Sequence, residues 1–301
     1  MKIVVGSRGS KLALSQTNWV IDKLRENFPK ALFEVKVIKT KGDKIQNVSL
    51  DKIGDKGLFV KEIEKALLQN EIDLAIHSFK DMPSELPKGL IFAGVPKRED
   101  YRDVLILREG LSNLKDIPIG GKIGTGSKRR KYQFLKVRPD IKIVPIRGNI
   151  DSRIRKIDEM NIDGIILAAA GIKRLGLNEK INYYFNEDEM LPAPSQGALA
   201  LEIRKDDIRL KEMIEKIRDE KSAIQVKAER AFLEGVNGSC HIPIGALCIV
   251  NEEQIILNGL FGSDDGSILI KKSITGNIGE EEKIGKELAD EIMMEMRKYE
   301  G

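Results

Sequence analysis

The residue with the clearest chemical potential is Cys240, in the segment Gly-Val-Asn-Gly-Ser-Cys-His-Ile-Pro-Ile-Gly (residues 235–245). Glycine and serine before it favour a turn that exposes the sulfur, and Pro243 disfavours a regular helix just after it. The other cysteine, Cys248, lies in the apolar strand-like run Ala-Leu-Cys-Ile-Val and is expected to be an inert core residue. A thiol on such a loop is a candidate for covalent attachment, and an unmodified surface thiol fits the same pattern.

Positive charge is the second chemical feature, and it is concentrated in residues 122–155. This segment holds eleven Lys or Arg and two Asp, a net charge of +9, whereas the whole chain carries +4 and the remainder therefore −5. Concentrated arginine favours an anionic ligand, because a guanidinium can bind a carboxylate or a phosphate through two parallel hydrogen bonds. Nucleic acid is a competing ligand, but Tyr132 and Phe134 alone are too few aromatic residues for a base-stacking surface.

Length and composition limit the remaining possibilities. A chain of 301 residues with 41% hydrophobic content predicts two or three domains. Two cysteines in such different settings do not make a disulfide framework, which favours a reducing compartment. The N-terminus lacks a secretory signal and no apolar run is long enough to span a membrane, so we expect a cytosolic protein without a membrane partner. His77 and His241 are the only histidines, and we expect no metal site.

A pattern of strand, Gly/Ser loop and helix occurs twice. It is found first at residues 2–5, 6–10 and 11–27, and again at residues 122–123, 124–127 and 128–137. Such a loop points backbone N–H groups and the positive end of a helix dipole at whatever lies above it, which favours an anion. Two ordinary capped helices would have the same pattern. Neither loop matches a nucleotide-binding fingerprint.

The duplication extends further, because residues 71–81 resemble residues 161–171: an Ile-Asp pair, a buried strand and then a loop. We therefore predict an α/β fold with two similar periplasmic-binding-protein-like α/β domains around a cleft, plus a small C-terminal α+β domain. The predicted domains are residues 1–97 with 198–216, residues 101–192, and residues 220–301, which carry Cys240. Residues 191–197, with two prolines and a glycine, are expected to be a hinge or crossing segment.

Two alternative catalytic arrangements are disfavoured. His77, Ser78 and Asp81 do not make a triad, because successive residues of a strand point to opposite faces. Cys240 and His241 are neighbours in sequence, and neighbours rarely present their side chains to each other as a nucleophile and a base. A solute-binding protein without catalysis is a rival function, since two α/β halves around a cleft also suit capture alone.

Ten segments along the chain resemble those of one enzyme family. They include Ser-Arg-Gly-Ser-Lys-Leu-Ala-Leu (7–14), His-Ser-Phe-Lys-Asp-Met-Pro (77–83), Gly-Thr-Gly-Ser-Lys-Arg-Arg (124–130) and Gly-Ser-Cys-His-Ile-Pro-Ile-Gly (238–245). The others are residues 57–62, 98–100, 147–149, 167–177, 191–199 and 228–230. The ten segments follow one another along the chain in the same order as in the porphobilinogen deaminase (hydroxymethylbilane synthase) family. The chain therefore resembles this family over essentially its whole length. It departs from the commonest family pattern at Gly126, Lys128, Ser195 and Ser239.

The resemblance implies a transferase with one covalent dipyrromethane cofactor, joined to Cys240 by a thioether. Such enzymes condense four porphobilinogen molecules on this primer, with loss of ammonia, and release linear hydroxymethylbilane by hydrolysis. Every ring of the growing polypyrrole chain carries two carboxylates, which suits a site rich in arginine. We expect a monomer that binds no nucleic acid.

Residue roles follow from the matching motifs. Asp81 is the expected catalytic residue and also contacts the cofactor, because a carboxylate can stabilise positive charge on pyrrole nitrogens; a turn-forming aspartate has the same sequence pattern. The expected cofactor-binding residues are Cys240, Lys80, Asp81, Thr125, Ser127, Arg129, Arg130 and Arg153. The expected substrate-binding residues are Arg8, Ser10, Lys56, Arg147, Arg153 and Arg174, of which Lys56 lies in a polar stretch, residues 41–58, that we expect to cover the cleft.

Overall fold

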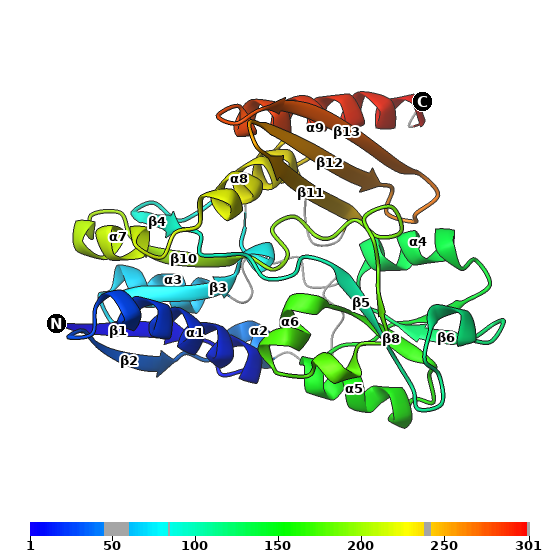
Figure 1. Ribbon diagram of the computed structural model, residues 1–301, viewed down its shortest axis with the longest axis horizontal. Helices are drawn as coiled ribbons and strands as arrows, with labels where there is room; N and C mark the ends of the chain where they lie inside the picture. Colours follow the sequence, from blue (N-terminus) through cyan, green and yellow to red (C-terminus); the bar gives the residue numbers. More distant parts are fainter. Residues whose placement is uncertain (45–59, 84, 238–241, 300–301) are drawn as a thin grey trace. The chain divides into compact units, whose positions relative to one another are not determined.

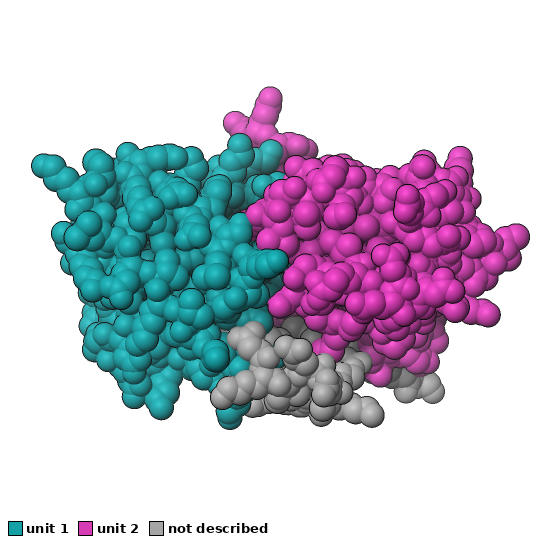
Figure 2. Space-filling model, turned by 90° about the horizontal axis from the view of Figure 1, so that it is seen from below, with its two compact units in different colours: residues 1–99, 197–223 teal, residues 100–196, 224–301 magenta. Residues whose placement is uncertain are grey.

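The computed structural model describes residues 1–44, 60–83, 85–237 and 242–299. They form two compact units, which are coloured separately in Figure 2. Unit 1 consists of residues 1–99 and 197–223, and unit 2 consists of residues 100–196 and 224–301. The two predicted α/β domains fall in different units, while most of the predicted C-terminal domain belongs to unit 2. The finer division into three domains stays a prediction.

Unit 1 is built on a five-stranded sheet with the strand order β2-β1-β3-β10-β4. Its strands are β1 (Lys2–Ser7), β2 (Leu32–Val37), β3 (Leu74–Ser78), β4 (Leu90–Gly94) and β10 (Leu199–Arg204). Its helices are α1 (Lys11–Asn27), α2 (Lys41–Lys44), α3 (Lys61–Leu68), α7 (Ile208–Glu215) and the 3₁₀ turn η2 (Phe79–Asp81). Strands β1, β2 and β3 are parallel, whereas β10 is antiparallel to both of its neighbours (Figure 1).

Helix α1 has the predicted bounds, and its sequence explains them. Ser10 is the N-cap and accepts a hydrogen bond from the backbone N–H of Ala13 over 3.2 Å. This bond satisfies one of the N–H groups that the start of a helix leaves unpaired. The buried side chains recur at helical spacing: Ala13, Gln16, Thr17, Val20, Ile21 and Leu24. The helix thereby fixes the loop of residues 8–10 at the carboxyl end of β1.

Unit 2 contains a second five-stranded sheet, with the strand order β7-β6-β8-β5-β9. Its strands are β5 (Asp103–Leu107), β6 (Lys122–Gly124), β7 (Lys142–Val144), β8 (Gly164–Ala168) and β9 (Tyr183–Tyr184). Its helices are α4 (Lys128–Val137), α5 (Ile150–Glu159), α6 (Ala169–Arg174) and the 3₁₀ turns η3 (Leu114–Asp116) and η4 (Asn178–Lys180). Helix α4 also has the predicted bounds, and Phe134 anchors it in a core beneath the sheet.

The two sheets share one topology. In each, three parallel strands are followed by an antiparallel strand and then by an edge strand. The chain passes from one unit to the other after residues 99, 196 and 223, and the antiparallel strands β5 and β10 are the first strands after the first and second of these points. The predicted duplication of two α/β halves is therefore confirmed.

The C-terminal part of unit 2 is a three-stranded antiparallel sheet packed with helices. Its elements are β11 (Ile244–Asn251), β12 (Gln254–Gly262), β13 (Leu269–Asn277), α8 (Glu220–Gly235), α9 (Glu281–Met296) and the 3₁₀ turn η5 (Arg297–Tyr299). Helices α8 and α9 approach closely, since a Cβ atom on Gly285 would lie 2.5 Å from the Ala231 Cβ atom. This is the predicted small α+β domain.

A buried polar cluster lies under the sheet of unit 1. His77 on β3 contacts Glu202 on β10, with 3.0 Å between Nε2 and Oε2, and both side chains are almost fully buried. Glu64 on α3 is buried close to this pair. Burial and the charge of Glu202 raise the pKa of Glu64, while His77 and Lys61 oppose the rise. Folding therefore increases the affinity of Glu64 for a proton.

We predict that Glu64 makes the stability of unit 1 depend on pH. Its folded pKa lies above the ordinary value of 4.5, so the folded state binds the proton more tightly than the unfolded state does. Stability should be greatest below that value and should fall as pH rises through the raised pKa. Glu64→Gln should remove this fall in thermal melts across the acidic to neutral range. Glu71→Gln is the control, because Glu71 is exposed and Lys36 lowers its pKa; parallel curves for Glu64→Gln and the wild type would contradict the prediction.

Candidate functional site

The candidate site of unit 2 begins at the loop between β6 and α4. Thr125 Oγ1 accepts a hydrogen bond from the Ser127 N–H over 3.2 Å, and Ser127 Oγ caps α4 by accepting from the Arg130 N–H over 3.4 Å. Both hydroxyl oxygens act as acceptors here, so both hydroxyl protons remain available for an anion. A Cβ atom on Gly126 would lie 2.7 Å from the backbone oxygen of Ile146, so a larger residue here would require this backbone to shift.

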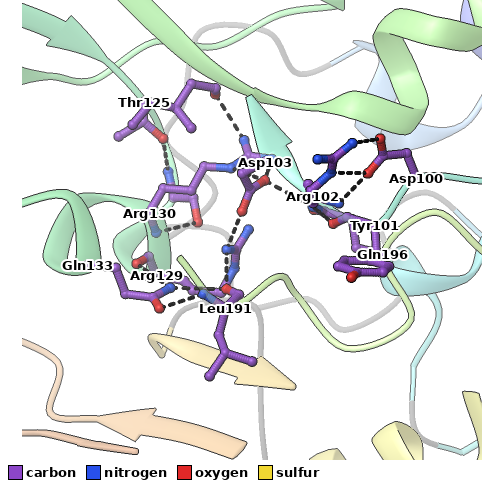
Figure 3. Close-up of polar contacts among 12 residues, drawn as sticks. Asp100, Tyr101, Arg102, Asp103, Thr125, Arg129, Arg130, Gln133, Leu191 and Gln196 are labelled. Atoms are coloured by element: carbon purple, nitrogen blue, oxygen red, sulfur yellow. Dashed lines mark hydrogen bonds and ion pairs between the residues drawn. The ribbon is translucent and has the colours of Figure 1, made fainter. Parts of the chain in front are cut away.

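A buried carboxylate organises the arginines that follow this loop. Asp103 opens β5 and is fully buried. Arg129 donates from Nη1 to Asp103 Oδ2 over 2.6 Å, and Arg130 donates from Nε to Oδ1 over 3.0 Å. Gln196 donates from Nε2 to Oδ1 over 2.9 Å. Figure 3 shows these contacts around Asp103, and we call Asp103, Arg129, Arg130 and Gln196 the Asp103 cluster.

The Asp103 cluster keeps a net positive charge. Burial alone would raise the pKa of Asp103, but the charges of Arg129 and Arg130 hold that pKa well below its usual range. One ionised carboxylate therefore faces two guanidinium groups, which are 4% and 6% exposed. Because a buried charge without a counter-ion is unfavourable, this arrangement is electrostatically complementary to one more anionic group.

The Asp103 cluster also holds the crossing segment. Arg129 Nη1 donates to the Leu191 carbonyl over 2.6 Å. Gln133 on α4 donates to the same carbonyl over 3.1 Å and accepts from the Leu191 N–H over 2.8 Å. Gln196 donates to the Tyr101 carbonyl over 2.7 Å. One end of residues 191–196 is thus fixed to α4, which carries the two arginines, and the other end is fixed to the start of β5.

Three further arginines of unit 2 follow parallel strands. Arg147 follows β7, and its Nη1 atom is buried without a hydrogen-bond partner within the described residues. Arg153, in the first turns of α5, donates from Nε to the Gly148 carbonyl over 2.7 Å. Arg174 ends α6, the helix after β8, and is half-buried. Because the carboxyl ends of parallel strands meet at one edge of a sheet, these residues share an edge with the loop of residues 125–127.

Unit 1 presents the other predicted residues at the equivalent edge of its sheet. The half-buried Arg8 and Ser10 follow β1, while Lys80 and the exposed Asp81 lie in η2, directly after β3. Turn η2 is anchored at its start, because the Phe79 N–H donates to the Ala198 carbonyl over 3.0 Å. The exposed carboxylate of Asp81 is therefore carried by a turn whose first residue is hydrogen-bonded to the backbone just before β10.

Two predicted residues, Cys240 and Lys56, lie outside the described residues. Cys248 is described and is fully buried in β11, as predicted. Three residues of the site were missed by sequence reasoning: Asp103, Gln133 and Gln196. A signal for one of them was present, because Asp103 begins the otherwise apolar strand Asp-Val-Leu-Ile-Leu, and an aspartate within such a strand needs a buried partner.

The comparisons with known proteins agree along the whole chain. The family model "Porphobilinogen deaminase, dipyromethane cofactor binding domain" matches residues 3–212, and "Porphobilinogen deaminase, C-terminal domain" matches residues 223–294. The porphobilinogen deaminase of Clostridium novyi (strain NT) is 60% identical over 98% of this chain and 100% of its own length. That of Clostridioides difficile (strain 630) is 57% identical over the full length of both chains.

Among solved structures, the chain resembles the methionine-binding protein MetQ with a TM-score of 0.47 and 11% identity, over 73% of this chain and 91% of that one. The family assignment rests on the sequence relatives and on the two family models, which together span nearly all of the chain. The chain therefore belongs to the porphobilinogen deaminase family, as its motifs predicted.

Proposed function

We propose that this protein is a porphobilinogen deaminase, which condenses four porphobilinogen molecules head to tail with loss of ammonia and releases hydroxymethylbilane by hydrolysis. The observation that carries the proposal is the Asp103 cluster, in which one carboxylate only half neutralises two buried guanidinium groups. Both the substrate and its product are carboxylates, and the relatives are named for this activity. The sequence motifs and the charge of the site thus support the same chemistry.

The residues of unit 2 fit the dipyrromethane cofactor that the family model names. The excess positive charge of the Asp103 cluster suits the carboxylates of the cofactor. The Nη1 atom of Arg147, which has no hydrogen-bond partner among the described residues, suits a carboxylate of the substrate. When bound, the cofactor supplies the nucleophilic pyrrole carbon to which substrate is joined. The residues proposed to hold it are Cys240, through a thioether, and Lys80, Asp81, Thr125, Ser127, Arg129, Arg130 and Arg153.

Asp81 is the proposed catalytic residue. An exposed carboxylate at the carboxyl end of β3 can accept a hydrogen bond from a pyrrole N–H of the substrate, and it can stabilise positive charge as that charge develops on the nitrogen. The same oxygen can hold a proton during transfer. Since η2 is tied to the sheet at Phe79, the carboxylate needs little reorganisation when the charge forms.

Binding of porphobilinogen and of the growing chain is the proposed role of the remaining residues. They are Arg8, Ser10, Lys56, Arg147, Arg153 and Arg174. None of the helices in the described ranges is both long and apolar enough to cross a bilayer. A cytosolic monomer that binds no nucleic acid remains our expectation from the sequence.

The first prediction from the proposed function concerns Cys240. Intact-mass measurement should show the wild type with the added mass of two linked pyrroles, and Cys240→Ser with the bare polypeptide and no turnover, because a serine hydroxyl is a much weaker nucleophile than a thiolate. Cys248→Ala should keep the added mass, since Cys248 is a core residue. A bare wild type that still binds pyrroles would instead indicate a solute-binding protein.

The second prediction concerns Asp81. Asp81→Asn keeps the size of the side chain but removes the charge, so turnover should fall on the order of 100-fold or more, as it does when a preorganised electrostatic group is lost. The intact mass should stay that of the wild type. Asp22→Asn, on the exposed face of α1, is the control. Turnover near the wild-type rate in Asp81→Asn would show that Asp81 is a turn residue without a catalytic role.

The third prediction separates two arginines of unit 2. Arg147→Leu should stall elongation, seen by native mass spectrometry as fewer added pyrroles after a substrate pulse, with little loss of thermal stability, because its Nη1 atom has no partner among the described residues to lose. Arg138→Leu should lower the thermal stability and leave elongation unchanged, since Arg138 binds Asp140 and the Leu114 carbonyl. If both variants elongate normally, Arg147 does not bind the growing chain.

A further inference from the structure

We propose that Asp103 is a positioning residue, which orients the guanidinium groups of Arg129 and Arg130 toward the carboxylates of the cofactor. This inference rests on the proposed function and assigns a role to a residue that the sequence motifs leave without one. Asp103 contacts both arginines from the first position of β5 and is fully buried. A buried carboxylate that accepts several charge-assisted hydrogen bonds fixes its donors more firmly than a surface pair does.

The contacts fix the orientation of each guanidinium. Arg129 uses Nη1 for both the Asp103 carboxylate and the Leu191 carbonyl, so the edge formed by Nε and Nη2 is not committed to either of them. That edge has the forked geometry that binds a carboxylate through two hydrogen bonds. Arg130 lies with Nε and Nη2 on Asp103 Oδ1, and its Nη1 atom donates to the Ile166 carbonyl over 3.1 Å. Rotation of either group would break contacts on two sides.

Charge gives a second argument. Without Asp103, two guanidinium groups would lie buried side by side without a counter-ion, and their repulsion would force them apart or toward solvent. A second protein carboxylate beside Asp103 would neutralise both arginines and would leave no positive charge for an anionic ligand. One carboxylate for two arginines therefore keeps the pair together and still leaves charge for a ligand. A role in stability alone would require only the first of these two properties.

The test compares Asp103→Asn with two controls in the same unit. Asp140→Asn removes the carboxylate of a surface arginine pair, in which Arg138 and Asp140 are 2.7 Å apart. Gln225→Leu removes a buried helix side chain that donates to the Cys248 carbonyl over 2.8 Å, far along the chain from the arginines, and serves as the control for lost stability. Intact mass gives the fraction of molecules with the two-pyrrole addition, and thermal melts give stability.

We expect Asp103→Asn to lower the fraction with the addition by on the order of 10-fold, about the effect of one lost charge-assisted hydrogen bond. Gln225→Leu should melt at a lower temperature than the wild type and keep the addition, and Asp140→Asn should resemble the wild type. The proposal is overturned if Asp103→Asn retains the addition. It is also overturned if Asp103→Asn and Gln225→Leu, at equally lowered melting temperatures, lose the addition to the same extent. A bare wild type would contradict the proposed function instead.

Asp103→Glu keeps the proposal testable if Asp103→Asn does not fold. Glutamate keeps the charge that holds the arginines together, but its extra methylene group moves the carboxylate and both guanidinium groups. We expect a folded protein by circular dichroism that carries less of the addition than the wild type. Full addition with wild-type turnover in Asp103→Glu would show that charge alone is sufficient and would exclude a positioning role.

Discussion

The structure of unit 2 depends on one buried ionic interaction, in which a single carboxylate, Asp103, contacts two guanidinium groups. Isolated buried charges are unfavourable, so Asp103, Arg129 and Arg130 must stay together, and their contacts join the start of β5 to the first turn of α4. The same arginines bind backbone carbonyls of the crossing segment and of β8. The arginines that we propose to bind a carboxylate thus also form a structural junction of the unit.

Duplication of the sheet explains why the site residues lie on loops far apart in sequence. Each unit has three parallel strands whose carboxyl ends face one edge, and in each the strand that follows a crossing lies antiparallel in the fourth place. The edge of unit 1 carries Arg8 and Asp81, and that of unit 2 carries the loop of residues 125–127 with its arginines. Rigid sheets can present such loops while the loops themselves vary in sequence.

The sequence predicted the elements well because their signals are local. Ser10 and Ser127 mark the starts of α1 and α4 by capping chemistry, and both helices end where predicted. The Asp103 cluster was not predicted, because it depends on pairing across 26 positions between Asp103 and Arg129, which no local pattern reports. Arg129 and Arg130 were assigned to the cofactor from a motif, and the structure adds the protein contacts that hold them. Gln133 was also missed, because it lies in α4 among several Lys and Arg residues and no local pattern distinguishes it.

The departure at Ser195 shows how the crossing segment tolerates a residue that its backbone disfavours. Ser195 has a φ of 61°, in the left-handed region that suits glycine, the common family residue here. Its hydroxyl oxygen is buried and has no partner within the described residues. The compensation comes from Glu229 on α8, which accepts from the Ser195 N–H over 2.6 Å and from the Cys248 N–H over 2.9 Å. A buried carboxylate thus ties Ser195 to β11, and Asp103 accepts from the neighbouring Gln196. The other end of the segment, Leu191, is held by Arg129 and Gln133. The segment in which two prolines predicted a hinge is thus held near both of its ends by contacts within unit 2.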